Sequence, residues 1–357
     1  MYALVNNLLD KNRKSAANKT LVVFIVENYA KIELMIKPLT LGKRTFSTNL
    51  IQGPLAGVSC TPFRLLSWRL SQPAFSCTEM ISGKTLLNKP SLTQQRFINK
   101  NPEEGPVCFQ LASSDPNELA EATRRATDFG ADVIDLNCGC PVKKIRSKGA
   151  GSALLTDPTK LYHMIHAMKQ HTHVPVSIKI RVEGNSENKF NHELARVITE
   201  AGADFVTVHG RHWTEHYETP CRHEQIQFFV NELKIPVIGN GDVRDLESLK
   251  TMFATGCAGV MIGRAGVGQP WLIAKLMAEY QGKDFTIPSN PEIAALFIEH
   301  VAGLIALLNN ERFAIIQARK LANYYGRSLP NKIAFCNLIN TCYTFADLQS
   351  ICLSHFI

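Results

Sequence analysis

The sequence has little that points to a secreted or membrane protein. It carries no secretory signal with a cleavage site, and its ten cysteines are scattered over 357 residues without the density of a small disulfide scaffold. The apolar run Thr20–Val26 covers seven residues, whereas a membrane-spanning helix needs about 20. We therefore expect a cytoplasmic protein with free thiols and no membrane association, and we expect a monomer.

Composition and charge are those of a globular protein with a basic balance. Hydrophobic residues make up 45% and charged residues 20% of the chain, which supplies enough apolar surface for a core. Lys and Arg outnumber Asp and Glu by 39 to 31, a formal net charge of +8. This excess suits a polyanionic partner such as nucleic acid, although many basic proteins bind none.

Short apolar or β-branched runs alternate with stretches of helical spacing along most of the chain. We expect strands at Asn49–Gly53, Ala74–Glu79, Val107–Leu111, Val133–Leu136, Val176–Ile180, Phe205–His209, Val237–Asn240 and Gly259–Gly263. Helices are expected at Asn117–Gly130, Thr159–His171, His192–Gly202, Glu224–Leu233 and Leu246–Gly256. This alternation implies parallel strands, either closed as a barrel or open as a doubly wound sheet.

Local signals divide the chain further. Asp115-Pro116 and Asp157-Pro158 each place an N-cap directly before a first-turn proline, so two helices should begin there. After Pro288 the strand signal ends, and we expect a helical bundle formed by Pro291–Asn309, Phe313–Tyr325 and Asn331–Cys352.

These signals predict three regions. Residues 35–285 form the barrel, residues 286–357 form a small helical domain, and residues 1–34 are an N-terminal extension. Two readings of the extension stay open, since either Met35 is the true initiator or the segment is an N-terminal arm.

Polar or small residues stand at the end of nearly every expected strand. In an open sheet such groups would gather beside one switch point, whereas a barrel collects them from all its strands at one mouth, so we expect a closed (β/α)8 barrel. The groups are Pro54-Leu55-Ala56, Glu79, Gln110, Asn137–Cys140, Lys179, His209-Gly210-Arg211, Asn240-Gly241-Asp242 and Gly263-Arg264.

Two glycines close the last two strands. Barrels commonly place a phosphate at this position, against glycine backbone N–H groups and a short helix. Gly241 and Gly263 stand there, and Arg264 adds a guanidinium that can bind phosphate through two hydrogen bonds. The alternative is that both glycines serve only as turns.

The fourth strand ends in Asn137-Cys138-Gly139-Cys140-Pro141. A C-x-C pair supplies two metal ligands, and no second pair with zinc-like spacing appears, so we expect no metal. A disulfide across one intervening residue would be strained. Two interpretations of the motif remain. One thiol is exposed and acts as an acid or a nucleophile, or the cysteines serve only in packing. The basic stretch Lys143–Lys148 follows, either as a solvated loop or as a phosphate contact.

Taken in order, the motifs strongly resemble those of the tRNA-dihydrouridine synthase family, from about residue 36 to about residue 330. The motifs are Gly53–Gly57, Gln110–Pro116, Asn137–Pro141, Lys148–Leu155, Ser177–Arg181, Val208–Arg211, Gly239–Asp242 and Met261–Ala265. Val142-Lys143-Lys144 and the compact tail are most similar to the bacterial B-type enzymes, which implies a uridine of the tRNA D loop as target.

The resemblance implies FMN over the barrel mouth, with NADPH or NADH as reductant and tRNA as substrate. It places Pro54, Leu55 and Ala56 against the flavin ring and Gln110, Lys179 and His209 near its polar edge. It assigns the phosphate to Asn240, Gly241, Asp242, Gly263 and Arg264. It makes Cys140 the proton donor to uracil C5, and Asn137, Lys148, Arg181 and Arg211 substrate contacts.

Two other functions stay open on the sequence. A flavoenzyme acting on a free pyrimidine would share the barrel and the ring chemistry, although the basic stretch and the helical tail speak against a small substrate. A non-catalytic RNA-binding protein could keep the fold, but it would not need Cys140.

Overall fold

The computed structural model describes residues 35–88, 96–183 and 189–357. The expected extension over residues 1–34, with its apolar run Thr20–Val26, lies outside these ranges. Residues Pro38–Ile357 form one compact unit, which contains both the barrel and the C-terminal helices.

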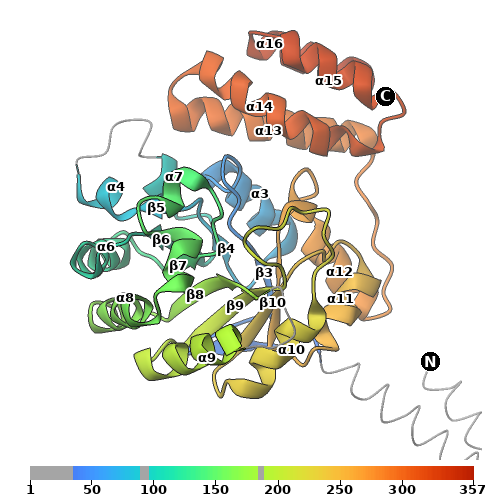
Figure 1. Cartoon of the computed structure of the whole chain (residues 1–357). Helices are drawn as coiled ribbons and strands as arrows, with labels where there is room; N and C mark the ends of the chain where they lie inside the picture. Colours follow the sequence, from blue (N-terminus) through green and yellow to red (C-terminus); the bar gives the residue numbers. More distant parts are fainter. Residues whose placement is uncertain (1–34, 89–95, 184–188) are drawn as a thin grey trace, which may run out of the picture. The chain divides into compact units, whose positions relative to one another are not determined.

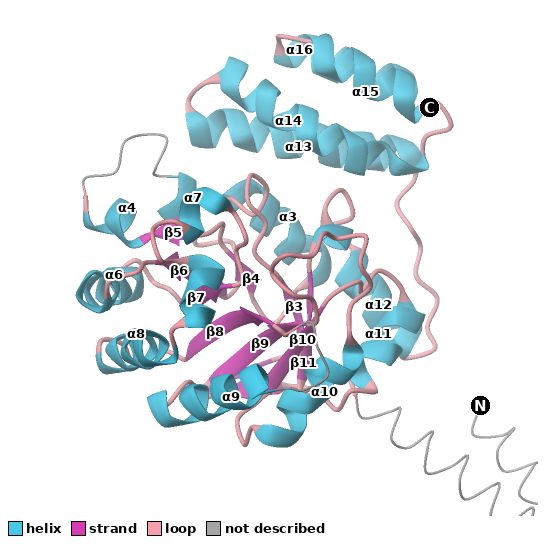
Figure 2. Cartoon of the chain, viewed as in Figure 1, coloured by secondary structure: helices cyan, strands magenta, loops and turns pink. Residues whose placement is uncertain are grey.

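Eight of the described strands form a closed parallel barrel (Figures 1 and 2). Every neighbouring pair in the ring is parallel, and pairing of β4 with β6 closes it. The predicted barrel and its strand positions are therefore confirmed. The strands are β3 (Leu50–Gln52), β4 (Ser76–Cys77), β6 (Val107–Ala112), β7 (Val133–Cys138), β8 (Val176–Arg181), β9 (Phe205–His209), β10 (Val237–Asn240) and β11 (Gly259–Ile262).

Helices surround the ring because each βα unit must return the chain to the start of the next parallel strand. They are α3 (Thr61–Ser71), α6 (Pro116–Asp128), α8 (Pro158–Gln170), α9 (Lys189–Ala201), α10 (His223–Glu232), α11 (Leu246–Phe253) and α12 (Leu272–Tyr280). Shorter elements flank the mouth: β5 (Ile81–Ser82), α4 (Gly83–Leu87), α7 (Lys143–Arg146), η1 (Gly151–Thr156) and η2 (Arg264–Gly266).

A β-hairpin that the strand pattern did not predict packs with the barrel core. β1 (Leu39–Leu41) and β2 (Arg44–Phe46) pair antiparallel. Their buried side chains join a cluster with Phe75 and Phe205, and the rings of Phe46 and Phe75 lie 5.3 Å apart.

Both predicted Asp-Pro helix starts are confirmed. The Asp115 carboxylate accepts a hydrogen bond from the Glu118 N–H at 2.7 Å, and the Asp157 carboxylate accepts one from the Lys160 N–H at 3.0 Å. Each bond satisfies a first-turn N–H that has no partner within its helix.

The C-terminal region contains one helix more than expected. α13 (Asn290–Leu308) and α14 (Glu311–Tyr325) match the prediction, but the single helix expected over Asn331–Cys352 is wrong. The chain instead forms α15 (Lys332–Thr341) and α16 (Phe345–His355). The break occurs because Cys342 and Thr344 are extended and the Thr344 hydroxyl accepts a hydrogen bond from the Asp347 N–H at 3.1 Å, which caps a new helix.

Within the described residues, α13 is long and apolar enough to cross a bilayer by length and composition. In this fold it packs against α14, α16 and α3. Phe297, Val301 and Leu304 on α13 lie in the apolar core of the helical region.

A buried ion pair anchors α3 beside the barrel. Arg64 Nε lies 2.6 Å from the Glu104 carboxylate, and both side chains are 1% exposed. Further hydrogen bonds run from the guanidinium to the carbonyls of Ser59 and Asn99, at 2.9 and 2.7 Å. Removing one partner would leave a charge buried without compensation.

We therefore expect Glu104→Gln to lower the free energy of unfolding by about 3 kcal/mol. The exposed pair between Arg69 and Glu299, at 2.7 Å, provides the matched control, and Glu299→Gln should cost less than about 1 kcal/mol. Urea denaturation of both variants measures the difference. Equal losses of unfolding free energy in the two variants would contradict the view that burial makes the Arg64–Glu104 pair more costly to break.

Candidate functional site

A cavity of about 800 Å³ opens at the carboxyl ends of the barrel strands. Of the residues to which the family resemblance gave a role, only Lys148 does not line it, and Lys148 is exposed just after α7. Of the other expected strand-end groups, Glu79, Cys138 and Gly210 do not line it. The residues brought together are Pro54, Leu55, Ala56, Gln110, Asn137, Cys140, Lys179, Arg181, His209, Arg211, Asn240, Gly241, Asp242, Gly263 and Arg264.

Cys140 is a partly exposed thiol in the loop after β7, whereas Cys138 is fully buried within the strand. The backbone N–H and the backbone carbonyl of Cys140 both form hydrogen bonds. Its N–H donates to Asn137 Oδ1 at 2.9 Å, and its carbonyl accepts from the Ser152 hydroxyl at 2.9 Å. Arg146 donates to Ser152 at 2.8 Å and stacks on the ring of Trp213. The surrounding backbone therefore fixes where the thiol stands.

The amide of Asn137 is largely used within the protein. Its oxygen accepts from the backbone N–H groups of Gly139 and Cys140, and its nitrogen donates to Gln110 Oε1 at 2.8 Å. One amide hydrogen remains for a ligand. Asn137 can therefore offer a ligand a donor, but not the full donor and acceptor edge that its type suggests.

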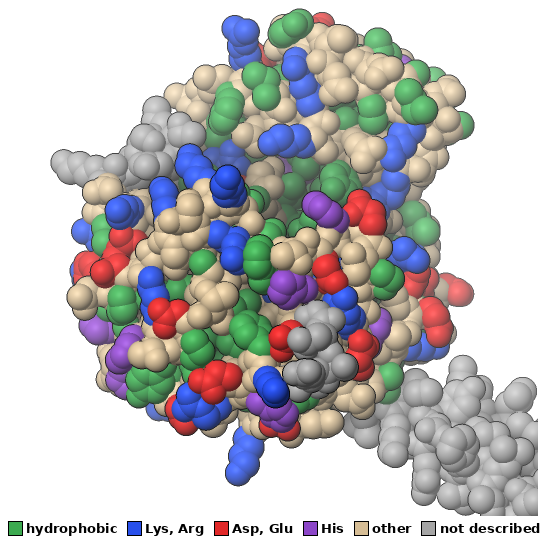
Figure 3. All heavy atoms as spheres, viewed as in Figure 1, with side chains coloured by type: hydrophobic (Ala, Val, Ile, Leu, Met, Phe, Trp, Pro, Cys, Tyr) green, Lys and Arg blue, Asp and Glu red, His purple; other side chains and the backbone are tan. Residues whose placement is uncertain are grey.

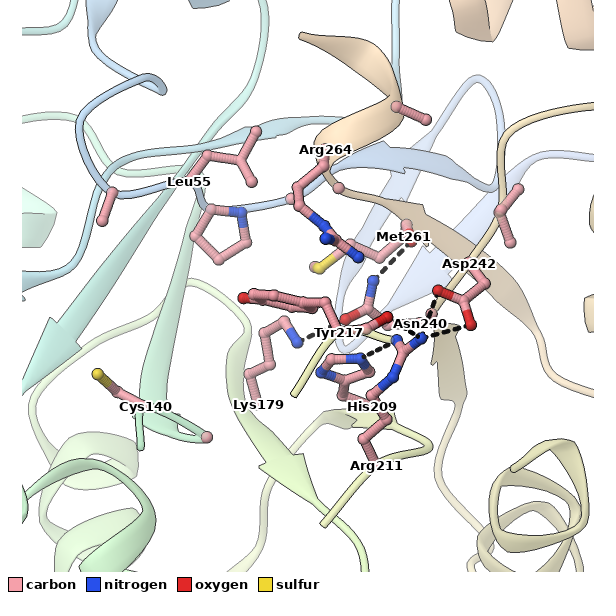
Figure 4. Close-up of a pocket in the computed structure, with 18 of the residues that line it drawn as sticks. Leu55, Cys140, Lys179, His209, Arg211, Tyr217, Asn240, Asp242, Met261 and Arg264 are labelled. Carbon is pink, nitrogen blue, oxygen red and sulfur yellow. Dashed lines mark hydrogen bonds and ion pairs between the residues drawn. The ribbon is translucent and has the colours of Figure 1, made fainter. Parts of the chain in front are cut away.

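Arg211 lines the pocket, although only 2% of the residue is exposed. Its guanidinium bonds to both oxygens of Asp242 and to the carbonyls of Tyr217 and Thr219 (Figure 4). It also lies 3.1 Å from His209 Nε2. Because arginine can only donate, Nε2 must accept, which places the proton of His209 on Nδ1. Arg211 thus holds other site residues in place.

His209 and Lys179 both lie in surroundings that disfavour charge. Burial, followed by the nearby cations Lys179, Arg181, Arg211 and Arg264, holds the pKa of His209 well below its ordinary value. Burial and then Arg181 lower the pKa of Lys179 to about 8. Lys179 Nζ donates to Asn240 Oδ1 at 2.7 Å.

Tyr217, which sequence reasoning did not select as a site residue, reaches into the pocket. Its ring lies 3.7 Å from the Arg264 guanidinium, and Figure 4 shows the two side chains directed into the same space. Tyr217 comes from the irregular loop after β9, where no periodic pattern marks which side chains turn inward. The sequence offered one signal for Tyr217: it is an aromatic residue in the segment between the strand-end motifs His209-Gly210-Arg211 and Asn240-Gly241-Asp242.

The two strand-end glycines differ in what they require. Gly241 has φ +138°, and a Cβ there would come 2.5 Å from Cys221 Sγ, so only glycine fits. A Cβ on Gly263 would meet no protein atom within 4 Å. Gly263 therefore leaves its backbone open toward the cavity, beside the Arg264 guanidinium.

The C-terminal region completes one wall of the cavity. Asn323, Tyr324, Arg327 and Lys332 line it, and Arg327 donates to the carbonyl of Val267 in the loop after η2. Cationic groups therefore border the cavity from both the barrel and the helices. Among the residues described, no group of three or more His, Cys, Asp or Glu could hold a metal.

The fold and the pocket define a class of protein, a (β/α)8-barrel enzyme. Its cavity suits a ligand that carries both an anionic group and an apolar ring system, and the Cys140 thiol lies beside that cavity. Comparison with known proteins narrows the class. The family model described as dihydrouridine synthase matches residues 51–356. The chain therefore belongs to the dihydrouridine synthase family of oxidoreductases.

Individual relatives agree with the B-type resemblance. The chain is 33% identical to tRNA-dihydrouridine synthase B of Pseudomonas aeruginosa over 297 residues, which are 83% of this chain and 89% of the relative. It is 34% identical to tRNA-dihydrouridine synthase B of Vibrio parahaemolyticus over 74% of this chain and 83% of the relative. A probable tRNA-dihydrouridine synthase of Rickettsia bellii is 31% identical over 85% of this chain and 93% of the relative.

The contact between Arg211 and His209 makes a spectroscopic prediction. Histidine-selective nitrogen NMR should show His209 as the neutral Nδ1–H tautomer at neutral pH, with His209→Gln identifying its signals. Arg211→Met removes one of the cations that lower the pKa, so the pKa of His209 should rise. Arg222→Met is the control, since Arg222 pairs with Glu215 instead. If the pKa of His209 is the same in the wild-type protein and in Arg211→Met, this assignment is contradicted.

Proposed function

We propose that this protein is a tRNA-dihydrouridine synthase that reduces the C5–C6 bond of a D-loop uridine, with FMN as cofactor and NADPH or NADH as reductant. The observation that carries the proposal is the joint placement of the Cys140 thiol and the Lys179, His209 and Arg264 groups around one cavity. We further propose that it acts as a cytoplasmic monomer.

The cavity fits FMN in size and in chemistry. Its volume of about 800 Å³ lies within the usual range for ligand pockets, about 300 to 1,000 Å³. Pro54, Leu55, Ala56 and Met261 offer apolar surface for a ring system. Arg264 and the open backbone of Gly263 suit a phosphate, and Lys179 and His209 would lie near polar ring atoms.

When bound, FMN would supply the hydride that reduces C6 of the uracil. Cys140 would donate the proton to C5, so its thiol must stay protonated until that carbon gains negative charge. The remaining Asn137 amide hydrogen would donate to a uracil carbonyl and orient the ring. Arg181, 5% exposed at the end of β8, would direct its guanidinium to the substrate side of the cavity.

Transfer RNA would bind across the mouth. Lys and Arg side chains lie on several sides of the hollow seen in Figure 3, beside His and acidic side chains. Lys143 and Lys144 are exposed on α7, and Lys148 is exposed just after it. We propose that residues 286–357 act as a tRNA-binding domain, with exposed Lys320 and Arg327 following phosphates. The target uridine must leave its stack to reach Cys140.

The role of Cys140 predicts a selective loss of activity. Cys140→Ala should slow dihydrouridine formation by about 100-fold or more, because general acids contribute about 10² to 10⁴ in rate. FMN binding and flavin reduction by NADPH should persist. Mass spectrometry of unmodified tRNA incubated with each protein, mapped site by site, measures the product.

Cys336→Ala is the control, because Cys336 is the other thiol with intermediate exposure and lies on α15. Full tRNA reduction by Cys140→Ala would reject the assignment. Turnover of uracil or orotate by the wild-type protein, with tRNA unchanged, would support the alternative of an enzyme acting on a free pyrimidine.

The lowered pKa of Lys179 predicts how FMN affinity depends on pH. Lys179 is charged below about 8 and neutral above it, so binding that uses its charge is present at lower pH and lost as pH rises through that value. We expect an affinity loss of about 10-fold between about pH 7 and about pH 9. Flavin fluorescence titrations measure it.

Lys179→Met should bind FMN weakly and without that step in pH. Lys169→Met is the matched control, because Lys169 bonds to Asp204 and does not line the cavity. An identical pH profile in wild type and Lys179→Met would contradict the role of the Lys179 charge.

A further inference from the structure

A chain of buried hydrogen bonds runs from the barrel interior to the loop that carries Cys140. Asp135 on β7 is 4% exposed. One of its oxygens accepts from the Ser177 hydroxyl at 2.6 Å, and the other accepts from Gln110 Nε2 at 2.8 Å. Gln110 Oε1 accepts from Asn137 Nδ2, whose own oxygen accepts from the Cys140 N–H.

The direction of every bond in this chain is determined by its two ends. An ionised carboxylate can only accept, so Gln110 must turn its nitrogen toward Asp135 and its oxygen toward Asn137. A backbone N–H can only donate, so Asn137 must turn its oxygen toward Cys140. The orientations of both amides follow from this logic.

We infer that Asp135 is a positioning residue for the reaction: its acceptor-only carboxylate orients the amides of Gln110 and Asn137 and thereby holds the Cys140 loop. The inference rests on the proposed role of Cys140. Asp135 does not line the cavity, so it acts through Gln110 and Asn137.

The energetics agree with a role beyond packing. Burial raises the pKa of Asp135 to about 6, even though hydrogen bonds from Ser177 and Gln110 favour its charged form. Keeping this carboxylate ionised at neutral pH therefore costs stability. An apolar side chain would fill the same interior without that cost, but it would leave Gln110 free to turn over.

The test is a reversal of hydrogen-bond polarity. Gln110→Glu removes the amide donor that faces Asp135 and sets two carboxyl groups against each other. Because such a pair can share one proton at neutral pH, both readouts are taken at a pH high enough to ionise both groups, where the chain should break. Asp135→Asn keeps an acceptor for Gln110 and should leave the chain intact. In the double variant the amide introduced at position 135 can donate to the carboxylate introduced at position 110. The second oxygen of that carboxylate still accepts from Asn137, so the chain should form again.

Two readouts separate positioning from flavin contact. The first is the turnover of tRNA, which we expect Gln110→Glu to lower by about 10-fold or more and the double variant to recover. The second needs neither tRNA nor FMN: the rate at which iodoacetamide alkylates Cys140, followed by peptide mass spectrometry. That rate should change several-fold in Gln110→Glu and return to the wild-type value in the double variant, while Cys336 reacts at an unchanged rate.

Asp132→Asn is the matched control, since Asp132 directly precedes β7 and accepts from the Val107 N–H at the opposite end of the barrel. It should leave both readouts unchanged. If Gln110→Glu does not fold, Asp135→Ala removes the acceptor of the same hydrogen bond and should alter both readouts, whereas Asp135→Asn should not.

The outcomes distinguish the two proposals. A double variant no better than Gln110→Glu, or Cys140 alkylation that Gln110→Glu and Asp135→Ala leave unchanged, overturns the positioning role. Wild-type protein that leaves tRNA unreduced, but whose Cys140 alkylation follows the polarity pattern, rejects the proposed function and keeps the positioning role.

Discussion

Pairing of β4 with β6 is the contact on which the rest of this structure depends. Ser76 and Cys77 lie beside Val107 and Cys108, and this short parallel pairing joins the two ends of the sheet into a ring. Because every neighbouring pair in the ring is parallel, all the carboxyl ends face the same side. Residues from Pro54 to Arg264 thereby surround one cavity, although they are far apart along the chain.

Closure also buries polar groups that then control one another. Asp135 is buried inside the barrel, and His209 and Lys179 line the cavity; in each case burial shifts the pKa in the direction that favours the neutral form. The hydrogen bonds between Asp135 and Gln110, between Gln110 and Asn137 and between His209 and Arg211 are buried, so the orientation of each amide and of the imidazole is set by its neighbours. This rigidity would suit the proposed reaction, in which the Cys140 thiol must meet one particular carbon.

Much of the fold was predictable because it rests on local signals. The eight strands lie in short apolar or β-branched runs between turns, and Asp115 and Asp157 mark helix starts by their own side chains. The failed helix over Asn331–Cys352 shows the limit of periodicity. Apolar spacing continues through the break, and the cap at Thr344 depends on one hydrogen bond that no periodic pattern reveals.

The site residues were predictable as a set but not in their individual settings. Strand ends predicted most of the residues that line the cavity, because a barrel gathers them, and the family resemblance added Arg181. Arg211 was expected at the substrate, yet it turns inward to Asp242 and His209, since the Asp242 carboxylate and two backbone carbonyls accept hydrogen bonds from its guanidinium. Lys148 stays outside the cavity, and Tyr217 enters from an irregular loop whose path depends on what it packs against.

The sequence alone determined which residue types were available and where each strand and most helices begin, because propensity, capping and alternation act over a few neighbouring residues. Only the tertiary structure decided which of those residues meet, which way their amides point and which charges burial disfavours. The physical reason is distance along the chain: Gln110, Asn137, Lys179, His209 and Arg264 interact through a closed barrel, and no local pattern encodes an orientation that a distant partner imposes.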